Sequence, residues 1–242
     1  MALKSMLKAL FRYLPFDVSI NQAYDRQSWQ VIKKVCDQNA CCVDVGCHKG
    51  EIMDWFIQRS PKGKHWGFEP IPDMYDKLDL KYQNNRNITI YPYALSETNG
   101  TTTFNLVVTN PAYSGMVKRN YDHANEKDQT IEVEMRTLDD LLAAVNRIDL
   151  IKIDVEGAEL QVLKGAVNTL TRTKPTVIFE HGLGASDCYG TQPTDVFQFF
   201  QGLNYSLNTM ENWLKNLPPL SKAEFEQQFY QKLNFYFIAV PS

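Results

Sequence analysis

Short apolar runs alternate with amphipathic stretches along most of the chain. The runs have the length and apolar density of buried strands; they lie at 41–46, 65–69, 87–93, 149–155, 176–181, 205–209 and 235–240. Helical patterns of apolar residues occupy 28–37, 51–59, 73–82, 138–145, 158–170 and 194–201. Strands that alternate with helices are typical of βαβ units. The pattern therefore predicts an α/β, Rossmann-like fold, with about seven mostly parallel strands and helices on both faces.

One part of the chain departs from this rhythm. Residues 101–108 and 130–136 resemble strands rich in β-branched side chains, and the polar stretch 109–129 separates them. We interpret 109–129 as an excursion from the sheet. It is either a substrate lid, because function concentrates on long polar loops, or a solvated loop.

The length of 242 residues suits one α/β domain. We expect a helical extension over 1–35 that packs on a domain formed by 36–242. The formal net charge of −3 argues against nucleic acid as a partner, because phosphate-binding proteins usually carry a basic excess. Five cysteines without a C-x-x-C pair indicate reduced thiols and a cytoplasmic location.

The first sixteen residues form a basic amphipathic pattern. Leucines at 3, 7, 10 and 14 share one helical face, and Lys4, Lys8 and Arg12 form a separate stripe. We expect this helix to cap the domain or to pair with a second copy in a homodimer. Peripheral membrane contact through 1–16 is the alternative that we do not favour. No run in the sequence is long and apolar enough to span a bilayer.

The first strand ends in a glycine turn, V-D-V-G-C-H-K-G at 43–50, which leads directly into a helix. Gly46 and Gly50 permit a tight turn, and free N–H groups at the helix start suit an anionic group. The second strand ends in Glu69, where a carboxylate can accept hydrogen bonds from both ribose hydroxyls. A dinucleotide fingerprint needs glycine at the place of His48, to admit a pyrophosphate. S-adenosylmethionine has no pyrophosphate, so the turn favours this cofactor.

Acidic groups gather at the ends of two later strands. Alternation along 149–155 puts Lys152 and Asp154 on one side of the strand, together with Glu156 just beyond its end. Glu180 and His181 end another strand. Ionisable groups on such apolar strands are costly unless they pair or serve a site, so we expect these carboxylates and His181 to converge on one pocket. For Lys152 we favour a role as buried partner of Asp44 or Asp154.

The segment 151–166 reads I-K-I-D-V-E-G-A-E-L-Q-V-L-K-G-A and resembles the hallmark block of the FkbM family of methyltransferases. The resemblance extends to V-D-V-G at 43–46, G-F-E-P at 67–70, A-L-S at 94–96 and T-L-D-D-L at 137–141. It implies a class I methyltransferase fold, S-adenosylmethionine as cofactor, and methylation of a hydroxyl on a sugar, glycan or natural product. The resemblance implies that Asp44, Gly46 and Glu69 bind the cofactor. We expect further cofactor contacts from His48, Gly50, Pro70, Ala94, Leu95 and Asp154.

Methyl transfer to a hydroxyl requires that its proton leave. The candidates for the catalytic groups are Asp154, Glu156, Glu180 and His181. Asp154 and Glu180 could also hold a divalent cation, as in catechol-type enzymes, but no compact ligand motif is present and we do not expect a metal. A nicotinamide-dependent oxidoreductase and a non-catalytic module built on a cofactor fold are the alternative functions.

Overall fold

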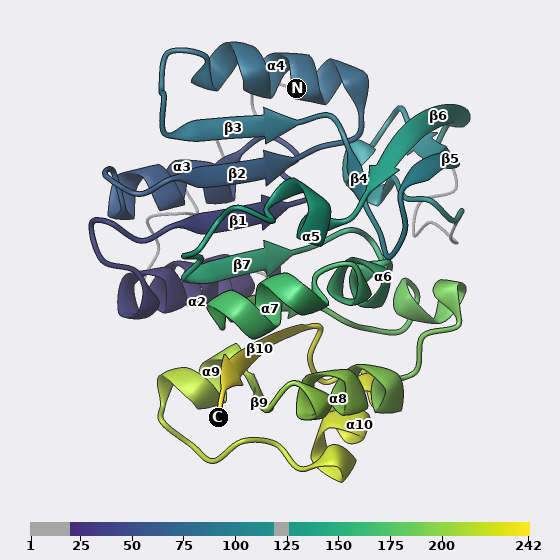
Figure 1. The fold of residues 1–242 in the computed structure, drawn as a ribbon. Helices are drawn as coiled ribbons and strands as arrows, with labels where there is room; N and C mark the ends of the chain where they lie inside the picture. Colours follow the sequence, from purple (N-terminus) through teal and green to yellow (C-terminus); the bar gives the residue numbers. More distant parts are fainter. Residues whose placement is uncertain (1–19, 119–125) are drawn as a thin grey trace.

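The computed structural model describes residues 20–118 and 126–242, so the expected helix at 1–16 lies outside the described residues. Its main sheet has seven strands in the order β3-β2-β1-β7-β8-β10-β9 (Figure 1). The strands are β1 Cys42–Val45, β2 His65–Phe68, β3 Ile88–Tyr91, β7 Leu150–Ile153, β8 Thr176–Glu180, β9 Tyr205–Thr209 and β10 Tyr236–Pro241. The five neighbouring strands β3, β2, β1, β7 and β8 pair in parallel. Strand β10 runs antiparallel to both of its neighbours, β8 and β9. The predicted fold class is confirmed.

Strand order reverses beside β1, which has β2 on one side and β7 on the other. In doubly wound sheets the crevice at this switch point, beyond the carboxyl ends of the strands, is where ligands bind. Both central strands are fully buried, because helices cover the two faces of the sheet.

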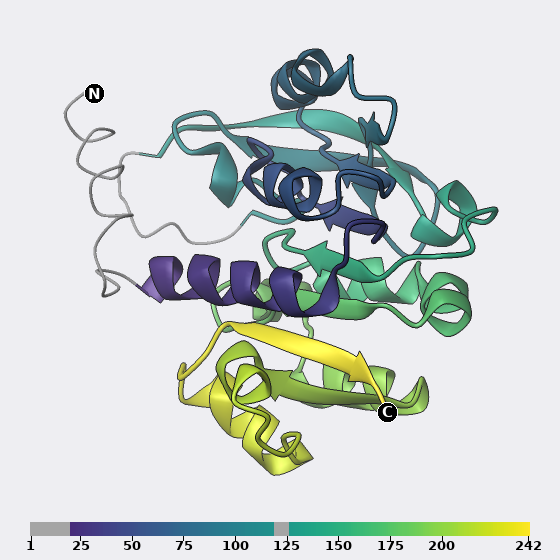
Figure 2. The same cartoon turned by 90° about the vertical axis from the view of Figure 1, so that its left-hand side faces the viewer.

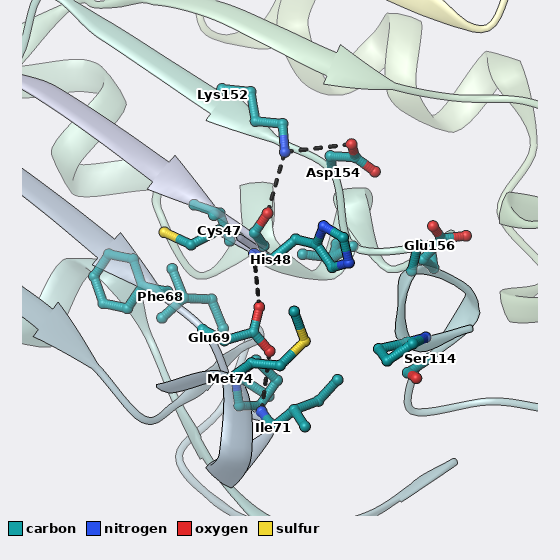
Figure 3. Close-up of a pocket in the computed structure, with 18 of the residues that line it drawn as sticks. Cys47, His48, Phe68, Glu69, Ile71, Met74, Ser114, Lys152, Asp154 and Glu156 are labelled. Atoms are coloured by element: carbon teal, nitrogen blue, oxygen red, sulfur yellow. Dashed lines mark hydrogen bonds and ion pairs between the residues drawn. The ribbon is translucent and has the colours of Figure 1, made fainter. Parts of the chain in front are cut away.

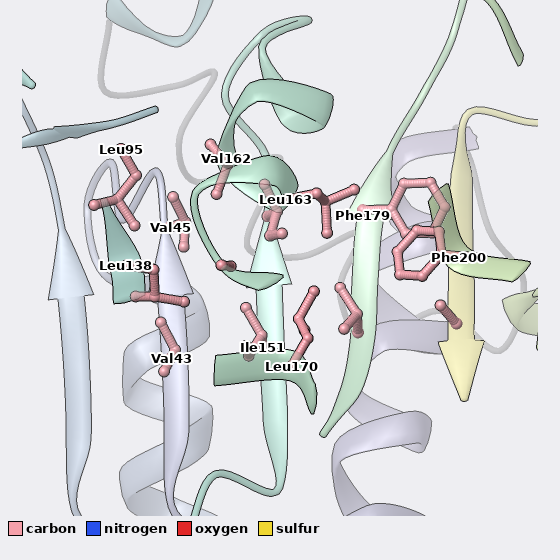
Figure 4. Close-up of a cluster of buried hydrophobic side chains, with 14 of the residues drawn as sticks. Val43, Val45, Leu95, Leu138, Ile151, Val162, Leu163, Leu170, Phe179 and Phe200 are labelled. Carbon is pink, nitrogen blue, oxygen red and sulfur yellow. The ribbon is translucent and has the colours of Figure 1, made fainter. Parts of the chain in front are cut away.

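Alternate residues of each strand enter two separate cores. Val43, Val45 and Ile151 pack with α5 to α8 and α10 on one face (Figure 4). Cys42 and Leu150 pack with α2, α3, α4 and α9 on the other. The helices are α2 Ile20–Val35, α3 Glu51–Arg59, α4 Pro72–Tyr82, α5 Leu138–Leu141, α6 Glu159–Lys164, α7 Val167–Thr173, α8 Pro193–Gly202, α9 Met210–Leu214 and α10 Lys222–Tyr230. In Figure 2, α2 (purple) runs along its face of the sheet beside α3, with which it packs.

Three helical predictions need correction, and two helices were not predicted. The helix expected over 158–170 is two helices, because Gly165 packs so tightly that a Cβ there would lie 2.0 Å from the Ser96 carbonyl oxygen. The helix expected over 138–145 ends at Leu141, and α2 begins at Ile20 instead of residue 28. Helices α9 and α10 were not predicted. No helix within the described residues is long and apolar enough to cross a membrane.

A second, three-stranded sheet projects from the carboxyl ends of the main strands (Figure 1). It contains β4 Ala94–Leu95, β5 Gly100–Val107 and β6 Asp128–Arg136, in the order β4-β6-β5. Strands β5 and β6 pair antiparallel, so the stretch 109–129 connects them and includes the start of β6. Its described part contains the 3-10 turn η1 Pro111–Tyr113, and Gly115 bridges back to Asn105. This stretch leaves the main sheet, as the sequence predicted.

Candidate active site

In the turn after β1, every second residue from 46 to 50 has a left-handed backbone conformation. Gly46, His48 and Gly50 have φ of 79°, 51° and 79°. A Cβ on Gly46 would lie 2.0 Å from the Asp154 carbonyl oxygen, and one on Gly50 would lie 2.4 Å from the Tyr82 hydroxyl oxygen. Both glycines are therefore required by their protein neighbours. The sequence predicted a tight turn at these glycines, and the structure has one.

Glu69 follows β2 and is joined to this turn. Its Oε2 accepts a hydrogen bond from the His48 backbone N–H at 2.8 Å, and its Oε1 accepts one from the Ile71 N–H at 3.0 Å (Figure 3). The side chain is buried, and burial raises the pKa of Glu69 to about 7, although the two backbone donors oppose the rise. The carboxylate that ends the second strand is thus fixed against the turn that ends the first.

A cavity of about 280 Å³ lies over the turn. Glu69 and His48 line one side of it, and Asp154 and Glu156 line the other (Figure 3). Its apolar wall consists of Phe68, Ile71, Met74, Ala94, Leu95 and Phe104, with Pro70 beside them. Helices α2 and α3 contribute Asp25 and Trp55 to a further part of the wall. The cavity therefore has both apolar and acidic walls.

Lys152 contacts two aspartates and the glycine turn beneath the cavity. Its Nζ lies 3.7 Å from Asp44 Oδ1 and 3.3 Å from Asp154 Oδ2, and it donates to the Gly46 carbonyl at 3.2 Å. The expectation that Lys152 pairs with these aspartates is confirmed. Asp44 is fully buried, and burial raises its pKa to about 6 despite the lysine. Asp44 does not line the cavity; its contact with the site is the ion pair with Lys152, which does line it.

Three acidic side chains meet at the ends of β7 and β8. Carboxylate oxygens of Asp154, Glu156 and Glu180 all lie within 4.8 Å of one another. Burial would raise the pKa of Asp154, but Lys152 and the Tyr236 hydroxyl, which donates to Oδ2 at 2.6 Å, lower it overall. Burial, then the neighbouring carboxylates, raise the pKa of Glu180 well above its usual value, and it hydrogen-bonds Asp154. The two pKa values are therefore moved in opposite directions, so Asp154 is the stronger acid of the pair.

Glu156 reaches the cavity because the chain turns sharply after β7. Glu156 and Gly157 both have positive φ, of 59° and 110°. Glu159 Oε1 accepts hydrogen bonds from the Val155 and Gly157 N–H groups, which fixes this turn. A non-glycine residue with positive φ is uncommon and is retained where the surroundings determine it.

His181 is not brought to the other predicted catalytic residues. Its ring stacks on Phe225 and Phe229, with centroids 5.8 Å and 4.7 Å away, and Nδ1 lies 3.0 Å from Ser186 Oγ. Burial lowers its pKa to about 4. Successive strand residues point to opposite faces, so Glu180 and His181 cannot both face the same pocket. Strand alternation could have excluded His181 from the sequence alone.

Three residues of this region were missed by sequence reasoning. Asp25 and Trp55 line the cavity from helices. Tyr236 contacts Asp154 from the last strand, where it pairs in register with Glu180. The helical spacing of Ile52, Trp55 and Arg59 does not distinguish a side chain that faces a cavity from one that packs in the core, so it could not predict the place of Trp55.

Comparison with known proteins agrees with this geometry. The model of the methyltransferase FkbM domain matches residues 44–207. The chain belongs to the FkbM methyltransferase family. The matched region contains the glycine turn, Glu69 and the three clustered carboxylates; it excludes α2 and β10, which also reach the site.

Curated relatives are similar over part of their length. The chain is 29% identical over 162 residues to the 2-O-methyltransferase NoeI of Sinorhizobium fredii, covering 60% of this chain and 65% of the relative. It is 28% identical over 141 residues to the hexuronic acid methyltransferase AglP of Haloferax volcanii, covering 57% and 52%. The chain thus spans about half to two thirds of the length of these relatives.

A solved FkbM methyltransferase from Methylobacillus flagellatus has the same fold. It superimposes with a TM-score of 0.53 at 16% identity, covering 84% of this chain and 44% of that one. At this identity the likeness concerns the fold alone.

Proposed function

We propose that this protein is an S-adenosylmethionine-dependent O-methyltransferase that acts on a hydroxyl of a sugar, glycan or natural product. The observation that carries the proposal is the Glu69 carboxylate, fixed on the cavity wall beside the glycine turn in a member of the FkbM family. S-adenosylmethionine supplies an electrophilic methyl group when it is bound.

The residues present fit this cofactor. A carboxylate offers about four acceptor positions, and two of those on Glu69 are used by backbone N–H groups, so two remain for the two hydroxyls of a ribose. Phe68, Ile71, Met74 and Leu95 form an apolar wall suited to an adenine ring. Asp154 and Glu156 provide negative charge for a sulfonium.

Glu156 is the group that we propose to accept the hydroxyl proton. Asp154 is a weaker base because Lys152 and Tyr236 stabilise its anion. The pKa of Glu180 is raised by burial, and neither Glu180 nor His181 lines the cavity. Of the four predicted catalytic residues, which are all described, Asp154 and Glu156 are the two that line the cavity.

The acceptor class follows from the relatives. One is named for a 2-O position and another for a hexuronic acid. Trp55 and Asp25 on the cavity wall suit a sugar, because an aromatic ring packs on sugar C–H groups and a carboxylate accepts from hydroxyls. All five cysteines are free thiols, which supports a cytoplasmic location.

We propose that catalysis needs no divalent cation, although the three clustered carboxylates offer oxygen ligands. Lys152 already compensates part of their charge, since its Nζ lies 3.3 Å from Asp154 Oδ2. Activity that survives dialysis against EDTA supports this proposal, and activity restored only by Mg²⁺ contradicts it.

Calorimetry with S-adenosylmethionine tests the function. We expect binding by the wild type, loss of binding in Glu69→Ala, and retained binding with lost methyl transfer in Glu156→Gln. Transfer is measured with labelled donor against pools of sugars and lipid-linked sugars. Binding of NADH in place of S-adenosylmethionine would identify the nicotinamide alternative, and the absence of S-adenosylmethionine binding at millimolar concentration would exclude the proposal.

A further inference from the structure

A second cavity, of about 230 Å³, adjoins the first. His48, Met74 and Pro111 line both cavities. One face of α4 forms a long wall, because Met74, Lys77, Leu78 and Lys81 recur at helical spacing. Lys49, in the glycine turn, closes the opposite side. We call this second cavity the lysine groove.

The lysine groove is basic in a chain whose net charge is −3. Its lining includes three lysines and no aspartate or glutamate among the described residues. Lys81 is partly neutralised, since its Nζ lies 2.7 Å from Asp54 Oδ2. Within the described residues, Lys49 and Lys77 have no carboxylate within ion-pair distance. Burial, then Lys49, lower the pKa of His48, so the positive charge comes from the lysines.

The groove is also held in place. Lys81 Nζ donates to the Lys49 carbonyl at 3.3 Å, and Asp54 accepts a hydrogen bond from the Tyr82 hydroxyl at 2.8 Å. These contacts join α3, α4 and the glycine turn. The ammonium groups of Lys49 and Lys77 therefore extend from a fixed frame, on which an anion meets two uncompensated positive charges.

We propose that the lysine groove binds an anionic group of the acceptor, so that the enzyme selects an acidic sugar or a sugar phosphate. The inference rests on the proposed function and deepens it. His48 lines both cavities, so an acceptor whose anion occupies the groove extends past the imidazole into the cavity that contains Glu156 and Glu69. The ligand chemistry is a carboxylate or phosphate oxyanion bound by ammonium groups.

The test compares three acceptors: glucose, glucuronate and glucose 1-phosphate. Affinity for each is measured by calorimetry on protein saturated with S-adenosylmethionine, and methyl transfer is measured with labelled donor. The variant is Lys49→Gln/Lys77→Gln, which removes two exposed charges without touching a buried contact. The matched control is Lys62→Gln/Lys64→Gln, two exposed lysines on the loop before β2, at the opposite end of the sheet.

We expect glucuronate, glucose 1-phosphate or both to bind at least tenfold more tightly than glucose. The groove variant should lose that preference, and the control should keep it. Binding of the anionic acceptors should weaken as salt rises from 50 to 500 mM, because exposed charges are screened. Preference for glucuronate alone identifies a carboxylate, and preference for glucose 1-phosphate alone identifies a phosphate.

Equal binding of all three acceptors, or an anion preference that survives Lys49→Gln/Lys77→Gln, would overturn the inference. If either of these results is found while the wild type still transfers methyl groups from S-adenosylmethionine to any of the three acceptors, the proposed function holds although the inference fails. Absence of S-adenosylmethionine binding in the wild type is the separate result that removes the proposed function itself.

Discussion

The Tyr236 hydroxyl donates a hydrogen bond of 2.6 Å to Asp154 Oδ2, so the last strand of the sheet touches the candidate active site. The same oxygen lies 3.3 Å from Lys152 Nζ. Asp154 is therefore stabilised as an anion from two directions, and the contribution of each can be measured.

Tyr236→Phe removes one donor to this carboxylate. We expect a loss of about 2 kcal/mol in the free energy of unfolding at pH 7, the typical value of a hydrogen bond to a charged group. The pKa of Asp154 is lowered in the folded protein, so its contribution is present above the unfolded pKa and disappears as pH falls through the folded one. The variant should therefore lose less stability than the wild type between pH 5 and pH 3, as urea unfolding at each pH will show. Tyr24→Phe is the control that keeps the bond between Tyr236 and Asp154. The Tyr24 ring is tilted against Tyr236 with centroids 4.9 Å apart, and this variant loses instead the hydrogen bond that the Tyr24 hydroxyl accepts from the Phe235 N–H.

Lys152→Met leaves Asp44 buried with no positive partner among the described residues. Breaking a buried ion pair by removing one side costs about 3–5 kcal/mol, because an uncompensated charge remains. Denaturant unfolding of Lys152→Met, of Asp44→Asn and of the double variant forms a thermodynamic cycle. We expect Lys152→Met/Asp44→Asn to be more stable than Lys152→Met alone. Additive losses would show that the 3.7 Å pair contributes nothing.

Buried carboxyls make the stability of this protein depend on pH. The pKa values of Asp44, Glu69 and Glu159 are raised by burial to about 6, 7 and 7. The folded state then binds protons more tightly than the unfolded state, so the free energy of unfolding should fall as pH rises from about 4.5 to 7. Glu69→Gln should remove on the order of 3 kcal/mol of this fall, since each pKa unit corresponds to about 1.4 kcal/mol. Thermal and urea unfolding without cofactor measure it, and the exposed Glu132→Gln should leave the pH dependence unchanged.

Gly46→Ala separates steric conflict from backbone strain. At Gly46 both act, since φ is 79° and a Cβ would lie 2.0 Å from the Asp154 carbonyl. Gly190 has a φ of 69°, and a Cβ there would have nothing within 4 Å, so Gly190→Ala reports strain alone. We expect a loss of about 1–2 kcal/mol for Gly190→Ala and of about 4 kcal/mol or more for Gly46→Ala. Similar losses in urea unfolding would mean that the backbone at Asp154, just after β7, moves to make room for the added methyl group.

The sequence predicted those elements that are marked by a pattern within their own residues. The central strands of the main sheet are buried on both faces and form continuous apolar runs, and the glycine turn is marked by its own residues. Helix α10 was missed although Ser221 and Glu224 form a capping box ahead of Phe225 and Phe229, a signature that the sequence contained.

Contacts between distant elements could not be predicted in this way. The bond between Tyr236 and Asp154 depends on the antiparallel register of β10 on β8, which no local pattern fixes. The place of Asp25 on the cavity wall depends on how α2 packs over α3. The candidate site was therefore predicted at its glycine turn and at the strand ends, and was incomplete where other elements cover it.

Two segments outside the family match complete the candidate active site. Helix α2 brings Asp25 to the cavity and β10 brings Tyr236 to Asp154, yet both lie outside 44–207. A fragment trimmed to 44–207 would lose one edge of its pocket together with a hydrogen-bond donor to its central aspartate. The contacts that complete this cavity therefore come from segments on both sides of the matched region as well as from that region itself.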